Sequence, residues 1–282
     1  MKRVILVGLG LIGGSIGLAL RRSVPRIELV GVDSRAIIDS ERCRNLLSRG
    51  VSREALLDPK AIVEDADLVV LAMPVREIAS QLSRWLAAGV PVTDCGSTKA
   101  YIAECVAKSP VRGWFLPGHP MAGRERGGLE SADSELFRGR RWIVCPEAVR
   151  EPVLEVTRQL IRELGAIWTE MTPSEHDSSV ALTSHFPQLV ASWLAANAGE
   201  SESKAAGPAF ADMTRGAGGS EAIWTDIFLT NAASMAEVLE GAAREFGSLA
   251  SDLRASPPRV DSLLTLLARA RSRKDPARKD ST

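Results

Sequence analysis

Aromatic residues and net charge are both scarce in this sequence of 282 residues. Tyrosine occurs once, at Tyr101, and aromatic side chains make up 5% of the chain. Lysine plus arginine and aspartate plus glutamate number 35 each, so the net charge is zero. Nucleic-acid-binding domains usually present a basic surface, and single strands are bound by stacking on aromatic side chains. We therefore expect no nucleic-acid partner, and the balanced charge with 45% hydrophobic residues also excludes a disordered polyelectrolyte.

The few cysteines and histidines form no pattern typical of a metal site or of a disulfide framework. The chain has four cysteines, at positions 43, 95, 105 and 145, without a Cys-x-x-Cys pair, and three histidines. Disulfide-rich proteins belong to oxidising compartments, whereas reduced thiols are typical of the cytosol. We therefore expect a cytoplasmic protein that binds no metal.

Only one apolar run approaches the length of a targeting or membrane segment. Residues 4–20 follow a basic start and resemble a signal peptide, but five glycines interrupt them, and Arg21 and Arg22 follow in place of a cleavage site. No other stretch reaches the ~20 uninterrupted apolar residues that a membrane span needs. We expect neither a leader nor a membrane segment.

The first half of the chain alternates short apolar runs with helix-like stretches. The runs predict strands at 4–7, 27–32, 68–72, 90–93 and 142–145. The stretches between them predict helices at 12–22, 38–48, 76–87, 99–108 and 152–164. Strands that read as continuous apolar runs and alternate with helices indicate an α/β fold, a doubly wound parallel sheet covered on both faces.

The second half is expected to be entirely helical. After Met171, apolar residues recur at spacings of three and four, which predicts helices at 174–198, 222–255 and 259–271. We therefore predict a dinucleotide-binding domain at 1–170, a helical substrate-binding and dimerisation domain at 171–272 and a disordered tail at 273–282. Residues 167–171 are an alternative last strand of the first domain.

A glycine-rich loop follows the first predicted strand directly. Residues 8–13 read Gly-Leu-Gly-Leu-Ile-Gly, the G-x-G-x-x-G pattern of Rossmann-type domains, and a helix is expected to begin there. The first glycine allows a tight turn, the second lets a pyrophosphate approach the backbone, and the third lets the helix pack on the strand. We predict that Gly8, Gly10, Leu11, Ile12 and Gly13 bind a dinucleotide at the positive end of the helix dipole.

Asp33 predicts which dinucleotide is bound. It ends the second predicted strand, 20 residues after Gly13, where an acid accepts hydrogen bonds from the adenosine ribose hydroxyls. A carboxylate there repels a 2′-phosphate and favours NAD over NADP. Arg35, two residues further on, would hold that phosphate if the cofactor were NADP.

Two loops after predicted strands carry candidates for catalysis. Residues 94–99 include Ser97, and residues 118–125 place His119 among small side chains. Ligands of doubly wound sheets bind at the carboxyl ends of the strands. A neutral imidazole accepts a proton near pH 7, so His119 is either a general base or an ordinary hydrogen-bonded loop histidine.

The helical half offers further candidates. His185 lies two residues before Pro187, which is expected to kink the helix, so His185 either lines a cleft or is simply buried. Arg215 precedes a glycine-rich turn and is either an anion clamp or a surface arginine. His176 is interpreted as a helix-start residue rather than a catalyst, with Ser174 as the N-cap and Asp177 in the first turn.

Several of these motifs together resemble the prephenate/arogenate dehydrogenase family of tyrosine biosynthesis. The motifs occur at 8–14, 94–99, 118–125, 176–177, 184–187, 212–215 and 224–227. The resemblance implies NAD-dependent oxidative decarboxylation. A hydride leaves C4 of prephenate, a base accepts the hydroxyl proton, and CO₂ departs as the ring becomes aromatic. The product is 4-hydroxyphenylpyruvate, or tyrosine when the substrate is arogenate.

The resemblance also assigns roles to residues. It makes His119 the base at the C4 hydroxyl and Ser97 its hydrogen-bonding neighbour beside the nicotinamide. It makes Arg215 the ligand of a substrate carboxylate, with His185 and Glu125 lining the pocket. Many members have a second histidine three residues after the first, near the substrate side chain, where this sequence has Gln188. A neutral amide carries no positive charge, so the choice between prephenate and arogenate stays open, with prephenate as the expectation.

Two other classes of function compete with this prediction. A β-hydroxyacid-type dehydrogenase would need a lysine at the cleft of the helical half, where Lys204 is the only lysine between Met171 and the tail. A non-catalytic NAD-binding redox sensor would not need His119, Ser97 and Arg215, so the presence of all three argues against it. Because the stretch 222–255 is apolar on more than one side, we also expect a homodimer through the helical half.

Overall fold

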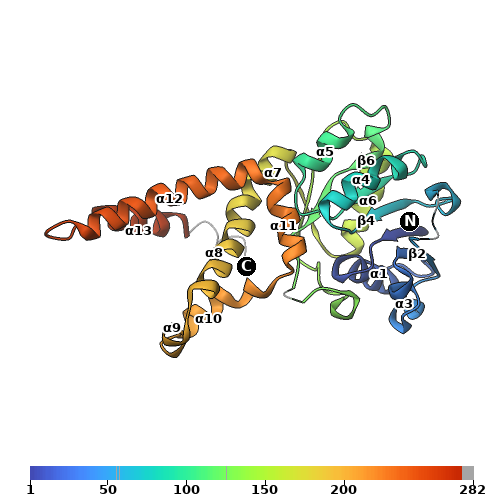
Figure 1. Cartoon of the computed structure of the whole chain (residues 1–282). Helices are drawn as coiled ribbons and strands as arrows, with labels where there is room; N and C mark the ends of the chain where they lie inside the picture. Colours follow the sequence, from blue (N-terminus) through green and yellow to red (C-terminus); the bar gives the residue numbers. More distant parts are fainter. Residues whose placement is uncertain (55, 57, 125, 275–282) are drawn as a thin grey trace. The chain divides into compact units, whose positions relative to one another are not determined.

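The computed structural model describes residues 1–54, 56, 58–124 and 126–274 (Figure 1). Glu125, which was predicted to line the substrate pocket, and residues 275–282 of the predicted tail therefore lie outside the described residues. Contacts divide the chain into two compact units, residues 1–232 and 233–282, and each is described by itself.

A six-stranded parallel sheet forms the centre of the first unit, in the order β3-β2-β1-β4-β5-β6 (Figure 1). This is the strand order of a doubly wound dinucleotide-binding domain and confirms the predicted fold class. The chain direction along the sheet reverses between β1 and β4, so a crevice opens outside the carboxyl ends of these strands. The strands are β1 (Arg3–Val7), β2 (Glu28–Asp33), β3 (Arg49–Ser52), β4 (Leu68–Leu71), β5 (Val92–Asp94) and β6 (Phe115–Leu116).

Helices bury both faces of the sheet, which explains why its strands read as continuous apolar runs. Leu6 packs into a core with α1 (Leu11–Ser23), α3 (Glu41–Leu46) and α6 (Glu151–Glu163). The next residue along the chain, Val7, packs into a second core with α4 (Val75–Leu86) and α5 (Ala100–Val106). Because successive strand residues point to opposite faces, both must be apolar.

The edge strand β3 has no such signal and was not predicted. Its residues, Arg-Gly-Val-Ser, are exposed or half-buried and form no apolar run. It is the outermost strand of the sheet and pairs with β2. In the chain, the short helix α2 (Arg35–Ile38) lies between these two strands.

A second sheet corrects the prediction that residues 142–145 extend the parallel sheet. It has three strands in the order β7-β8-β9, with β7 antiparallel and β9 parallel to β8. These strands are β7 (Gly118–Pro120), β8 (Arg141–Val144) and β9 (Ile167–Glu170). An apolar run predicts a buried strand but does not say which neighbour it pairs with, so this assignment depends on the tertiary structure.

The predicted helix 174–198 is two helices joined by a π-helical turn. α7 (Pro173–Val180) leads into the π turn Ala181–His185, and α8 (Phe186–Asn197) follows. Proline has no N–H to donate, and Pro187 lies just after the widened turn. The N-cap of α7 is Thr172 rather than Ser174, because the Thr172 hydroxyl accepts from the Glu175 N–H at 3.2 Å and Glu175 bonds back to the Thr172 N–H at 2.8 Å.

The predicted helix 222–255 is also interrupted. It divides at Asn231 into α11 (Glu221–Thr230) and α12 (Ala232–Arg254). The first unit ends beside this break, so by contacts it includes α7 to α11 as well as the two sheets. The predicted boundary at 170/171 marks the change from mixed to purely helical structure and stays a prediction. Two further helices precede α11: α9 (Glu200–Lys204) and α10 (Pro208–Thr214).

The second unit contains α12 and α13 (Asp261–Lys274), which are joined by an ion pair. The Arg269 guanidinium contacts both carboxylate oxygens of Glu245 at 2.7 Å. Helix α13 includes residues 273 and 274, which the prediction assigned to the disordered tail. Among the described residues, no helix combines the length and apolar character that a membrane span requires.

Candidate active site

The glycine-rich loop connects β1 to α1 as predicted. Gly8 has φ +89°, a left-handed conformation that favours glycine, and a Cβ there would meet the Ala72 carbonyl oxygen at 2.4 Å. A Cβ on Gly13 would lie 1.9 Å from the Gly8 carbonyl oxygen, so only glycine allows this close helix–strand contact. A Cβ on Gly10 would meet nothing within 4 Å, and Gly10 lines a cavity. This open approach to the N-terminus of α1 fits a pyrophosphate.

Asp33 lies at the end of β2, beside this loop. Its carboxylate accepts hydrogen bonds from the Leu9 N–H at 2.7 Å and the Ser34 N–H at 2.6 Å. These bonds fix the carboxylate in the lining of the cavity, where it can accept from ribose hydroxyls.

Arg35 does not join Asp33 in the lining of this cavity. It is exposed, and its Nε contacts Asp39 at 2.7 Å, an ion pair that raises the pKa of Arg35. Arg53, which was not predicted, also lines the cavity and lies close to Asp33. Its backbone N–H donates to the Asp33 carbonyl oxygen at 2.8 Å. Sequence reasoning missed Arg53 because the edge strand before it has no pattern.

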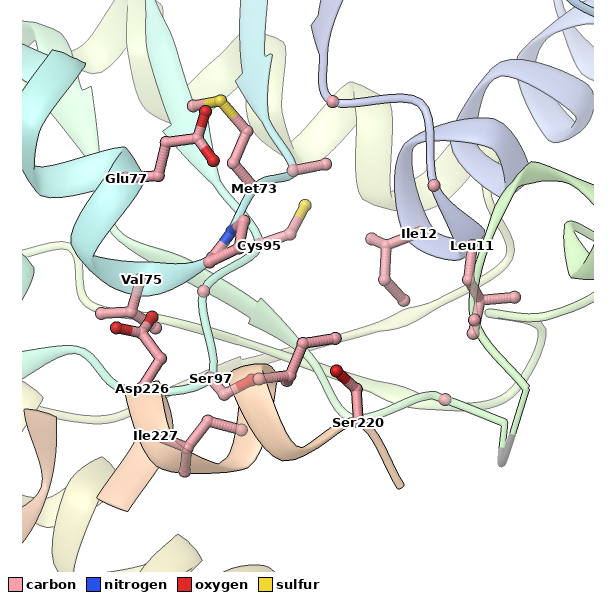
Figure 2. Close-up of a pocket in the computed structure, with 18 of the residues that line it drawn as sticks. Leu11, Ile12, Met73, Val75, Glu77, Cys95, Ser97, Ser220, Asp226 and Ile227 are labelled. Atoms are coloured by element: carbon pink, nitrogen blue, oxygen red, sulfur yellow. The ribbon is translucent and has the colours of Figure 1, made fainter. Parts of the chain in front are cut away.

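The cavity has a volume of about 880 Å³ and brings together most of the predicted site residues. This size is typical of a ligand pocket. Figure 2 shows Leu11 and Ile12 from α1 on one side of the cavity, and Ser97 together with Asp226 and Ile227 from α11 on the other. The predicted residues in its lining are Gly8, Gly10, Leu11, Ile12, Asp33, Ser97, His119, His185, Gln188 and Arg215.

His119 lies in a strand rather than in a loop. It is the central residue of β7 and pairs with Ile143 of β8. Both backbone groups of the preceding residue, Gly118, are hydrogen-bonded. Its N–H donates to Asp94 Oδ1 at 2.9 Å, and its carbonyl oxygen accepts from Lys99 Nζ at 2.7 Å. Lys99 and Asp94 are fully buried and form an ion pair with each other. The motif 94–99 thus positions the histidine, a role that its sequence did not reveal.

His176 lies at the start of α7, as predicted, but it has a contact that the sequence did not indicate. It is fully buried, and its Nε2 lies 2.8 Å from His119 Nδ1. Its other nitrogen, Nδ1, lies 2.7 Å from Asp177 Oδ1. The two histidines are 57 residues apart in the chain, so no local pattern could predict this contact.

Ser97 lines the same cavity as His119. In the described part of the chain no hydrogen bond joins these two side chains, and the role of Ser97 as the hydrogen-bonding neighbour of His119 stays a prediction. Ser97 follows β5 and lies at the carboxyl end of the sheet, where it remains available to a ligand.

His185 and Gln188 lie near the π turn. His185 is buried, with its ring edge-on to Trp224 at 6.1 Å and its Nδ1 3.2 Å from Asn231 Nδ2. Gln188 donates to the Gly216 carbonyl at 2.9 Å and so holds the 3-10 turn η5 (Arg215–Gly218), at the start of which Arg215 lines the cavity.

Burial lowers the pKa of all three histidines. Burial, the repulsion that a protonated His176 would add, and the Lys99 ammonium hold the pKa of His119 well below its usual value. Burial also lowers the pKa of His176, against the opposing effect of Asp177, and lowers the pKa of His185 to about 4. The cavity therefore contains a neutral imidazole that can accept a proton at neutral pH.

The fold and this cavity define the class: a protein with a doubly wound, dinucleotide-binding type of domain followed by a helical second half. Two family models match the chain: "Prephenate dehydrogenase, nucleotide-binding domain" at residues 16–170 and "Prephenate dehydrogenase, dimerization domain" at 172–269. The chain belongs to the prephenate dehydrogenase family, and this membership replaces the β-hydroxyacid alternative.

Individual relatives agree with the family models. The chain is 33% identical over 240 residues to the prephenate dehydrogenase of Bacillus subtilis, which covers 81% of this chain and 64% of that protein. The chain therefore spans somewhat less than two thirds of that relative.

Solved structures give the same result over nearly the whole chain. The Aquifex aeolicus prephenate dehydrogenase, in complex with hydroxyphenyl propionate and NAD⁺, is 27% identical with a TM-score of 0.79 and covers 98% of both chains. Synechocystis arogenate dehydrogenase is 26% identical with a TM-score of 0.78, covering 98% of this chain and 100% of its own.

Proposed function

We propose that this protein is a prephenate dehydrogenase that catalyses the NAD-dependent oxidative decarboxylation of prephenate to 4-hydroxyphenylpyruvate. The observation that carries the proposal is that one cavity is lined by the glycine-rich loop, by the neutral His119 and by Arg215. A dinucleotide site, a base and an anion ligand are what this reaction needs in one place. The relatives from Bacillus and Aquifex support the assignment.

The residues divide the chemistry between them. When bound, NAD supplies the acceptor for the hydride that leaves C4 of prephenate. His119 accepts the proton of the C4 hydroxyl, and a base positioned in this way typically contributes 10²–10⁴-fold to the rate. Arg215 binds a substrate carboxylate through charge-assisted hydrogen bonds. The ketone formed at C4 then draws electrons from the ring carboxylate, CO₂ leaves, and aromatisation makes the reaction effectively irreversible.

The decisive assay is NADH formation from prephenate and, separately, from arogenate, monitored by absorbance with the purified full-length chain. We expect oxidation of prephenate and release of CO₂. No absorbance change with either substrate and either nicotinamide cofactor would contradict the proposal and leave the non-catalytic NAD-binding sensor as the better account.

Arogenate is the second candidate substrate, and Gln188 is the observation that favours it. This neutral side chain bonds to the Gly216 carbonyl and brings no positive charge to the keto-acid side chain of prephenate. The Synechocystis arogenate dehydrogenase shows that arogenate oxidation occurs on this fold. The ratio of kcat/KM for the two substrates decides between them.

We propose NAD rather than NADP as the cofactor. The Asp33 carboxylate is fixed by two backbone N–H groups at the ribose end of the cavity, and it would repel a 2′-phosphate. Arg53, the cation in that region, is paired at 3.4 Å with Glu54 and at 3.7 Å with Glu77. A lower KM for NAD than for NADP is the expected result.

Replacing Arg215 with alanine is expected to raise the KM for prephenate by roughly 10–150-fold, with a smaller change in kcat. The reason is the loss of a charge-assisted bond to a carboxylate, which contributes about 1.5–3 kcal/mol. Steady-state kinetics at saturating NAD measures this. Arg158→Ala is the matched control, because Arg158 lies on α6 away from the cavity and should leave KM unchanged. An unchanged KM in Arg215→Ala would remove Arg215 from substrate binding.

We also propose a homodimer, formed through the helical half. Leu239, Phe246 and Leu253 recur every seven residues along α12 and are 40%, 58% and 58% exposed. A helix stripe of this kind is normally covered. Phe246→Glu should convert a dimer to a monomer in sedimentation at micromolar concentration, whereas Arg244→Glu, on the other side of the helix, should not. A monomeric wild type would contradict the proposal.

A further inference from the structure

A chain of three side chains leads away from the cavity through His119. His119 Nδ1 lies 2.8 Å from His176 Nε2, and His176 Nδ1 lies 2.7 Å from Asp177 Oδ1. His176 and Asp177 are buried and do not line the cavity, so they cannot touch a ligand there. Any effect that they have on the reaction must pass through His119.

The backbone determines the protons in this chain, starting from Asp177. Its Oδ1 accepts from the Lys99 N–H at 2.7 Å and its Oδ2 from the Ala100 N–H at 2.9 Å, so the carboxylate is an acceptor on both oxygens. His176 must therefore donate to it from Nδ1.

The rest of the chain follows from this first bond. A neutral imidazole has one donor and one acceptor nitrogen, so His176 Nε2 is the acceptor that faces His119. His119 then donates from Nδ1, and its lone pair is on Nε2, the nitrogen left for a ligand in the cavity.

We propose that His176 is a positioning residue that holds His119 in the Nδ1–H tautomer and, with Asp177, stabilises the positive charge that His119 gains during the reaction. The proposal rests on the proposed function, because the proton comes from the substrate hydroxyl. The O–H bond breaks, an N–H bond forms at His119 Nε2, and the hydride from C4 is taken up by NAD. The proton on Nδ1 stays in its hydrogen bond to His176.

Charged and titratable groups from neighbouring elements surround this chain. The Lys99 ammonium and His185 oppose a positive charge on His119, as a protonated His176 would, whereas the neutral His176 accepts the His119 Nδ1–H; Lys99 also acts on His176. Asp177 and Asp94 favour a positive charge on His176. The link through His176 to Asp177 therefore counteracts the unfavourable environment in which burial and Lys99 place the base.

Asn231 holds the other end of this arrangement. Its Nδ2 donates to the Asp177 carbonyl at 2.8 Å and to His185 Nδ1 at 3.2 Å. His185 must then carry its proton on Nε2, the opposite tautomer from the other two histidines. The structure thus predicts a specific pattern of three tautomers, two with Nδ1–H and one with Nε2–H.

Nitrogen NMR of the histidine rings tests this pattern directly. The chain has only three histidines, so single substitutions assign every ring signal. In wild-type protein with ring-¹⁵N histidine at neutral pH, we expect His119 protonated at Nδ1 and unprotonated at Nε2. His176→Gln should keep this tautomer, because a glutamine oxygen can accept from His119 Nδ1, whereas His176→Leu should abolish it.

Kinetics of the same variants test the consequence. Enforcing the wrong tautomer of a catalytic histidine costs up to about 10⁴-fold in kcat in serine proteases. We expect His176→Leu to lower kcat by at least roughly 100-fold with little change in KM, and His176→Gln to lose less. In both variants the acid limb of the kcat profile should move to lower pH, a shift that a merely structural defect would not cause. Unchanged NAD affinity confirms that the variants are folded.

The two readouts separate this proposal from the proposed function. The expected tautomers without oxidation of either substrate would contradict the function and support the positioning of His119. A wild-type His119 protonated at Nε2, or a His176→Leu variant with kcat within threefold of wild type, would overturn the positioning role.

Discussion

Replacing His119 with asparagine is expected to lower kcat by roughly 10²–10⁴-fold and to leave NAD affinity nearly unchanged. His119 lines the cavity from strand β7, which pairs with β8. The glycine-rich loop with Gly8 and Gly10 forms a separate part of the cavity wall. Asparagine fills part of the space of the ring but cannot accept a proton at neutral pH. Single-turnover rates of NADH formation and titration of NAD binding measure the two effects separately.

The pH profile gives this prediction a second measurement. Burial holds the pKa of His119 well below its usual value, so the imidazole is uncharged at pH 7 and stays uncharged as the pH falls towards that lowered pKa. Wild-type activity should therefore persist below the usual histidine pKa and fall only as the pH drops through the lowered value. The asparagine variant should lack this limb. A variant within threefold of wild type would exclude His119 as the base.

Replacing Asp94 with asparagine is expected to lower the free energy of unfolding by about 3–5 kcal/mol, because it leaves a buried ammonium without its counter-ion. Lys99 and Asp94 are both fully buried, and after the change Lys99 Nζ would keep the Gly118 carbonyl at 2.7 Å but lose the negative charge of the carboxylate. Asp94 also accepts from the N–H groups of Gly96 at 2.7 Å and Gly118 at 2.9 Å. Chemical denaturation with a two-state fit measures the loss.

The double variant Asp94→Asn with Lys99→Met is the matched control. Removing both charges removes the unpaired ion, so the double variant should be more stable than Asp94→Asn alone. Additive losses from the two single changes would show that the two side chains do not interact. A loss below about 1 kcal/mol in Asp94→Asn would show that the pair contributes little.

Much of the first half was predictable because its signals are local. Leu6 and Val7 face opposite cores, and this burial on both sides requires the unbroken apolar run that indicates a parallel strand. Gly8 and Gly13 are required by contacts within one strand–turn–helix unit, so their spacing alone was informative. Asp33 follows from the same unit by its distance along the chain.

The partners of the functional groups were not predictable in this way. His176 belongs to α7 and His119 to β7, and their contact depends on how two separate elements pack. The same holds for Lys99, whose place in a loop motif gave no indication that it would be buried against Asp94 and Gly118. The break at Asn231 was also missed, because its side chain bonds to Asp177 rather than to its own helix.

By itself, therefore, the sequence determined the doubly wound sheet, the nucleotide cradle and the set of residue types in the site, because periodicity and glycine spacing act over a few residues. The tertiary structure alone decided that residues 141–144 join a second sheet, that Arg35 lies outside the cavity and that His176 supports His119. The reason is that hydrogen bonds and burial between distant segments depend on packing, which leaves no local pattern in the chain.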